Sequence, residues 1–115
     1  MNERTNNILE HMLEDAEDIM TFINEIETFE KFSNSPLYKK GVVMSILNIG
    51  ELTKKLPDEF KEKYKDIPWR KVSGMRDIAA HGYHIMEDDI IWDVAKYSIP
   101  ELLDFIKRIL NKERT

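Results

Sequence analysis

The sequence predicts an all-α protein, an up-and-down bundle of four to five helices. Apolar residues recur every three or four positions along most of the chain, as they do on one face of a helix. No stretch alternates apolar and polar residues like a half-buried strand. The 115 residues contain no repeat and no linker-like segment, so we expect a single domain, 1–115, with a modest core.

The first predicted helix covers about residues 6–29, and a connection follows at 29–34. Acidic residues such as Glu14 and Glu17 fall on other faces than the apolar positions. His11 lies among these acids, and we expect it to be a solvated surface residue. The apolar positions are Ile8, Leu9, Met12, Leu13, Ala16, Ile19, Met20, Ile23 and Ile26.

The second predicted helix begins with Ser35 as its cap and Pro36 at its first position, and it runs to about Leu56. Gly50 lies inside it, where glycine costs roughly 1 kcal/mol relative to alanine. A close crossing with another helix would account for this glycine. Two interpretations are open for the adjacent Glu51: a plain surface acid, or a buried partner of a basic group.

A short helical turn is predicted at 58–64, and a longer helix follows it. Asp66 can cap that helix, and Pro68 is tolerated in its first turn. Its apolar face includes Trp69, and Gly82 is expected to stop the helix just past His81.

Three acids at 87–89 predict the start of another helix, because negative charge favours the positive end of the helix dipole. The apolar pattern then continues to Leu110. Pro100 interrupts it, which predicts either a kink or a break with Ser98 as a fresh cap.

The composition excludes several kinds of site. The chain has no cysteine, so it has no disulfide, no thiol nucleophile and no cysteine-ligated zinc. No apolar leader opens the sequence, and no run approaches 18 apolar residues. We therefore expect a cytoplasmic protein without a membrane partner.

Charge is distributed unevenly along the chain. The net charge of −5 argues against a general coat for nucleic acid. Residues 31–76, however, hold eleven basic and five acidic residues, whereas 1–30 hold one basic and nine acidic. This basic block leads into Arg76, so phosphate could be attracted locally. The alternative is an ordinary solvated face of lysines.

The side chains best suited to catalysis or phosphate binding lie in residues 75–83. Arg76 offers a permanent cation with a fixed fork of donors, which suits phosphate. His81 can donate and accept a proton near neutral pH, and Tyr83 carries a hydroxyl group. Arg76 and His81 lie about 140° apart on a regular helix, so they would not stack on one face. They can still border one cleft if His81 stands where the helix ends.

The pattern Arg-x4-His-x-Tyr resembles the signature of HEPN-domain ribonucleases, specifically the HepT-like toxins of type VII HepT/MntA toxin–antitoxin pairs. Three further segments resemble the same family in the same order. They are Asn48-Ile49-Gly50-Glu51-Leu52, Ile67-Pro68-Trp69-Arg70-Lys71 and Asp89-Ile90-Ile91-Trp92-Asp93.

The resemblance implies a HEPN-like bundle that dimerises, or forms a higher oligomer, through the motif helix. Arg76 and His81 of two chains would then form a composite endoribonuclease site for RNA that needs neither metal nor cofactor. Asp77 stands where many relatives have asparagine, and it could orient His81 or compete for Arg76.

The resemblance also implies that Tyr83 is AMPylated by a cognate MntA-like minimal nucleotidyltransferase, the antitoxin. The alternative for Tyr83 is an aromatic residue packed over the helix end.

Other interpretations of the site remain open. Arg76 could be a salt-bridge partner of Asp77, and His81 a helix-end residue favoured by the dipole. His81 and His84, with acids at 87–88, could form a metal site, although a helix stop at Gly82 would misalign them. The chain could also be a non-catalytic nucleotide- or partner-binding subunit of a nucleotidyltransferase, or a purely structural helical dimer.

Overall fold

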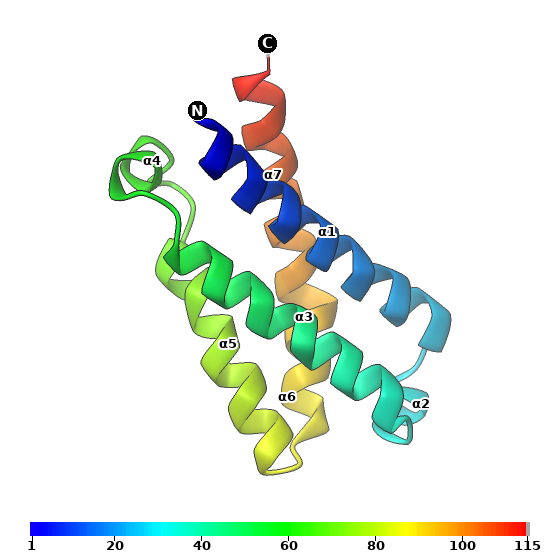
Figure 1. Cartoon of the computed structure of the whole chain (residues 1–115). Coiled ribbons are helices and arrows are strands. Elements are labelled where there is room, and N and C mark those ends of the chain that lie inside the picture. The colour runs from blue at the N-terminus through cyan, green and yellow to red at the C-terminus, as the bar shows by residue number, and fades with distance from the viewer. Residues whose placement is uncertain (115) are drawn as a thin grey trace.

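The computed structural model describes residues 1–114, and these contain helices but no strand, as the sequence predicts (Figure 1). Two short helices separate the first three long helices, and a fourth long helical segment follows the third directly. Within these residues, no helix is both long and apolar enough to span a membrane. The elements are α1 (Glu3–Ile26), α2 (Phe29–Ser33), α3 (Pro36–Lys54), α4 (Asp58–Lys63), α5 (Trp69–His84), and α6 (Asp88–Asp93), which continues through the π-helical turn η1 (Val94–Ser98) into α7 (Ile99–Glu113).

Capping side chains fix where the first helices begin. The Asn2 side chain accepts a hydrogen bond from the Thr5 amide at 2.8 Å, so α1 starts three residues earlier than predicted. Ser35 caps α3 as predicted, by accepting from the Tyr38 amide at 3.4 Å. The expected connection at 29–34 contains the short helix α2, which is capped by the hydroxyl of Thr28.

Helix α3 lies at the centre of the fold, with α5 on one side and α1 on the other, and α7 packs against α1 (Figure 1). The core combines residues from all of these helices. Every buried side-chain polar atom in residues 1–114 has a hydrogen-bond partner, so the core contains no uncompensated polar group. Its largest fully buried side chains are Phe32, Leu9, Met12, Ile19, Ile46, Ile49, Ile67, Ile91, Ile99, Leu102, Ile106 and Ile109.

Gly50 lies where α3 crosses α5, which confirms the close crossing predicted for it. A Cβ added at Gly50 would stand 2.5 Å from the Cβ of Arg76 and 3.0 Å from the carbonyl oxygen of Ser73. Both atoms belong to the rigid part of α5, so they cannot move aside without shifting the helix. The absence of a side chain at Gly50 therefore sets how closely α3 approaches α5.

The prediction that Asp66 caps α5 is wrong. Helix α5 begins at Trp69, and Pro68 at its N-cap provides no side-chain hydrogen bond. The amide of Ile67 bonds to the carbonyl of Tyr64, and this turn directs Asp66 away from the helix. Asp66 instead accepts a hydrogen bond from Arg108 of α7 at 2.7 Å.

The helix stop predicted at Gly82 is also wrong. Helix α5 continues to His84, and the chain reverses at Met86, which has a φ of 61°. Gly82 is buried inside the helix, where an added Cβ would lie 3.2 Å from the carbonyl oxygen of Glu87 and 3.3 Å from Ile91. Gly82 thus allows α6 to approach α5 closely, and it does not end the helix.

Pro100 neither breaks the last helix nor gives it a new cap. Ser98 has helical dihedral angles and makes no side-chain capping bond. A π-helical turn precedes the proline, with the Ile99 amide bonded to the carbonyl of Val94, five residues back. Because this wider turn accommodates a residue without an amide hydrogen, α6 and α7 remain one continuous helix.

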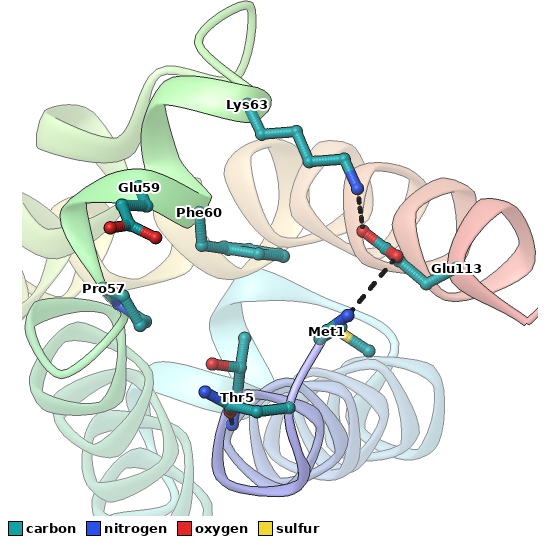
Figure 2. Close-up of a pocket in the computed structure, with 8 residues that line it drawn as sticks. Met1, Thr5, Pro57, Glu59, Phe60, Lys63 and Glu113 are labelled. Carbon is teal, nitrogen blue, oxygen red and sulfur yellow. Dashed lines mark hydrogen bonds and ion pairs between the residues drawn. The ribbon is translucent and has the colours of Figure 1, made fainter.

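The carboxylate of Glu113 joins both ends of the chain to α4, beside a pocket of about 290 Å³ (Figure 2). It accepts hydrogen bonds from the Lys63 ammonium at 2.9 Å and the Tyr64 hydroxyl at 2.7 Å, and it lies 3.9 Å from the amino terminus. Hydrogen bonds from Lys63 and Tyr64 lower the pKa of Glu113 below its ordinary value of 4.5. Burial and the bond to Glu113 raise the pKa of Tyr64 to about 12.

We predict that Glu113→Gln lowers the free energy of unfolding by about 1 kcal/mol near pH 7. The lowered pKa means that the carboxylate stabilises the fold above its ordinary pKa, and that this contribution disappears as the pH falls through the folded value. The free energies of unfolding of wild type and variant in urea should therefore converge once the pH falls below the lowered, folded pKa of Glu113. The control is Glu62→Gln, which alters an exposed pair with Lys65. A gap that persists unchanged in acid would contradict the assignment.

We further predict that Gly50→Ala lowers the free energy of unfolding by about 1–3 kcal/mol, because the added methyl forces α3 away from α5. Gly74→Ala is the matched control, since no atom lies within 4 Å of its added Cβ. That change should stabilise by about 0.5–1 kcal/mol, through helix propensity alone. Chemical denaturation of both variants checks the pair, and equal effects would refute the role given to the crossing.

Candidate functional site

Arg76 leaves α5 at the crossing with α3, and two carboxylates hold its guanidinium group. Its Nε pairs with Glu51 of α3, and its Nη1 lies 3.1 Å from Oδ1 of Asp77. Glu51 therefore does partner a basic group, but half of its side chain is exposed, so it is not the buried partner that one of the two interpretations expected. The Arg76 side chain is itself 41% exposed, so solvent and ligands can reach it.

His81 points outward from α5 and is exposed. Its side chain has no hydrogen bond or ion pair with any residue of 1–114. The helix does not end at His81, so Arg76 and His81 remain about 140° apart around its axis. Asp77 precedes His81 by four residues and so lies one turn below it, on the same face. Within residues 1–114, no hydrogen bond or ion pair joins Arg76 to His81.

The outward face of α5 also carries large apolar side chains. Ile78 is 47% exposed, and Ile85, just past the end of α5, is 45% exposed. Residues 78, 81 and 85 follow the spacing of one helical face, so His81 lies between the two isoleucines. Within residues 1–114, no other element covers this face.

Tyr83 lies within α5 and not beyond its end, which corrects the position expected from a helix stop at Gly82. It is half-buried against the core, which confirms packing as one of its roles. Its ring meets that of His84 edge-on at 6.0 Å. Tyr83 also borders a pocket of about 250 Å³ together with Pro36, Lys39, Met86 and Asp88.

Tyr83 and Arg76 occupy the same side of α5. They are seven residues apart, which corresponds to about 10 Å along the helix and only about 20° around it. Ala80, a small residue, lies between them. Tyr83 is thus aligned with Arg76, whereas His81 is rotated away from both.

Comparison with known proteins assigns the chain to a family. The family described as "Ribonuclease HepT-like" matches residues 12–109. The protein named "Putative RNase TTE0752" of Caldanaerobacter subterraneus subsp. tengcongensis is 40% identical over 106 residues, which cover 92% of this chain and 94% of that one. "Probable ribonuclease HepT" of Thermococcus cleftensis is 35% identical over 94 residues, 82% of this chain and 84% of its own. No solved structure matches significantly.

The chain belongs to the HepT-like ribonuclease family. The resemblance read from the Arg-x4-His-x-Tyr pattern is thereby confirmed, and an all-α HEPN-like bundle is what the structure shows. Family membership supports a ribonuclease activity. It does not identify the residues that carry this activity.

His81 and His84 do not form a metal site with the nearby acids in residues 1–114, although Gly82 does not misalign them. Because α5 continues to His84, the two histidines do share one helical face, three residues apart. Asp88, one of the candidate acids, instead binds Lys39 at 3.2 Å and the Ser33 hydroxyl at 2.7 Å. Residues 1–114 contain no group of three His, Cys, Asp or Glu side chains placed to hold a metal ion.

The HepT-like fold also has a polar groove that the sequence does not predict. It has a volume of about 360 Å³ and is lined by residues of α1 and α3. Burial, followed by the charges of Asp18 and Glu14, raises the pKa of Asp15 there. Its lining residues are His11, Glu14, Asp15, Asn48, Glu51, Leu52 and Lys55. His11 is exposed, as expected, and the Asn48–Glu51 segment was the only sequence signal for this surface.

Proposed function

We propose that this protein is a metal-independent endoribonuclease, the toxin of a type VII HepT/MntA pair, with Arg76 and His81 as its catalytic residues. The observation that carries the proposal is the accessible guanidinium of Arg76, fixed at the α3–α5 crossing of a HepT-like ribonuclease. A permanent cation held in this way is suited to a phosphodiester.

The site is completed by a second copy of the chain. On one chain, Arg76 and His81 leave α5 about 140° apart, and a second copy would supply a second His81 to the same site. The exposed Ile78 and Ile85 give the same helix an apolar face on either side of His81. Pairing two chains through this face would bury both isoleucines and bring two His81 side chains close to one phosphate.

The chemistry follows from RNA's own nucleophile. One His81 removes the proton of the 2′-hydroxyl, and this oxygen attacks the adjacent phosphorus. The other His81 donates a proton to the departing 5′-oxygen, while Arg76 offsets the charge that develops on the phosphorane. The products are a 2′,3′-cyclic phosphate and a 5′-hydroxyl. One proton is removed and one is donated, so the step needs no cofactor.

We predict that Arg76→Ala and His81→Ala each lower the rate of RNA cleavage by about 100-fold or more. His84→Ala is the matched control, because His84 is exposed on the same helix and has no role in the mechanism. Circular dichroism should show unchanged helicity in all three. EDTA should leave cleavage unchanged, and an oligonucleotide with a 2′-deoxy sugar at the scissile position should not be cut.

The same experiment includes a test of assembly. Ile78→Glu places a charge on the apolar face of α5, so light scattering should show monomers and cleavage should be lost with them. Wild-type protein that cleaves RNA as a monomer would refute the composite site. Wild-type protein that cleaves no RNA would refute the enzyme assignment itself.

Tyr83 is the proposed point of control by an MntA-like nucleotidyltransferase. Its alignment with Arg76 places an AMP group on its hydroxyl in line with the guanidinium, with only Ala80 between them. The phosphodiester of that AMP would be attracted to Arg76 and would compete with the substrate phosphate. Modification would therefore block RNA without unfolding the helix.

We predict that co-expression with the partner nucleotidyltransferase adds AMP-sized masses to the wild-type chain and none to Tyr83→Phe. Phenylalanine keeps the packing of the ring and removes only the acceptor oxygen, so the variant should remain an active ribonuclease that escapes neutralisation. Tyr38→Phe is the control, because the Tyr38 hydroxyl already donates to Glu25. A neutralised complex with unmodified Tyr83 would point to steric inhibition instead.

A second candidate function is a non-catalytic subunit that binds a nucleotide or the nucleotidyltransferase. The observation that favours it is the pairing of Arg76 with both Glu51 and Asp77, which leaves no net positive charge at the site. Partner or ATP binding that survives His81→Ala, together with absent RNA cleavage by the wild type, would select this function.

A further inference from the structure

The two carboxylates that hold Arg76 come from different helices, and they differ in how firmly their positions are fixed. Glu51 belongs to α3 and directly follows Gly50, so the contact between the helices fixes its position relative to Arg76. Asp77 directly follows Arg76 on α5, and its side chain is 77% exposed. Glu51 is therefore set by the fold, whereas Asp77 is free to change rotamer.

The two carboxylates also occupy different donors of the guanidinium group. Glu51 pairs with Nε, at the inner end of the group, and Asp77 binds the terminal Nη1. A phosphate that binds arginine in a bidentate way needs two adjacent N–H donors. With Nε occupied by Glu51, the available edge is the one formed by Nη1 and Nη2. Asp77 already holds one half of that edge.

We propose that Glu51 is a positioning residue that orients Arg76, and that Asp77 is a displaceable carboxylate that occupies the phosphate-binding edge until substrate arrives. This inference rests on the proposed ribonuclease function only for its effect on cleavage. The arrangement of the three side chains can be tested without RNA.

Charge supports this division of roles. Displacing Asp77 by a phosphodiester exchanges one negative charge for another, so the guanidinium remains balanced. If Asp77 stayed, its carboxylate and the phosphate would repel each other. Lys54, which lies 3.7 Å from Glu51 on α3, offsets the charge of Glu51 and gives it a further partner. Among residues 1–114, Glu51 thus has two cationic partners, and Asp77 has only Arg76.

The first arm of the test uses nuclear magnetic resonance of the Arg76 Nε–H group and inorganic phosphate as the probe. In wild-type protein this proton should be protected from solvent exchange, and in Glu51→Ala its exchange should accelerate about tenfold or more. Glu51→Gln keeps an acceptor oxygen and should restore most of the protection. Asp77→Asn should keep the protected proton and bind phosphate about threefold or more tightly than wild type.

The second arm uses RNA cleavage by the same proteins. Glu51→Ala should lower kcat about tenfold or more with little change in KM, and Glu51→Gln should recover part of that loss. Asp77→Asn should lower KM, because the competing carboxylate is gone. Lys65→Ala is the control, since it removes an exposed i,i+3 pair with Glu62 and should affect neither kcat nor Nε–H exchange by more than about twofold.

The outcomes separate this inference from the proposed function. If wild-type protein cuts no RNA but Arg76 Nε–H protection depends on Glu51, the positioning role stands and the ribonuclease assignment fails. If Glu51→Ala changes neither exchange nor kcat, Glu51 is not a positioning residue. If Asp77→Asn binds phosphate no more tightly than wild type, Asp77 is not the displaceable group.

Discussion

The contact between α3 and α5 at Gly50 is the constraint on which the rest of the structure depends. It brings the backbone of α3 against the Cβ of Arg76, so that the arginine leaves α5 directly beside α3. The residue after the glycine, Glu51, then meets the guanidinium that the glycine has positioned. The close packing of the two helices thereby sets the position of the Arg76 guanidinium group.

Much of this fold follows from local sequence, and the exceptions have a common cause. The apolar period located the long helices, and Ser35 and Gly50 have the roles that their residue types imply. Gly82 and Pro100 do not, because their roles depend on the surrounding structure and not on residue type alone. Gly82 admits α6, and a π-helical turn accommodates Pro100. The spacing of side chains along one helix contains no information about what packs against it.

The site shows the same division. Arg76, His81 and Tyr83 were identifiable from their chemistry and spacing, but their directions were not, because these depend on where α5 ends. Since it continues to His84, Arg76 and Tyr83 face one side and His81 faces the other. In our account Arg76 binds the substrate phosphate and Tyr83 is the point at which this binding is controlled. The side with His81 meets another chain. Glu51, twenty-five residues before Arg76, could be linked to it only through the fold.

The central claim is that the His81 side chains of two chains serve the same phosphate. Mixed dimers of one wild-type chain and one His81→Ala chain test it most directly. Two affinity tags allow the mixed species to be purified and its RNA cleavage to be compared with that of the wild-type and His81→Ala homodimers. Our account predicts that the mixed dimer is at least about tenfold less active than wild type, because one histidine is missing from the pair that removes and donates the two protons. A mixed dimer with about half of the wild-type activity would contradict the account.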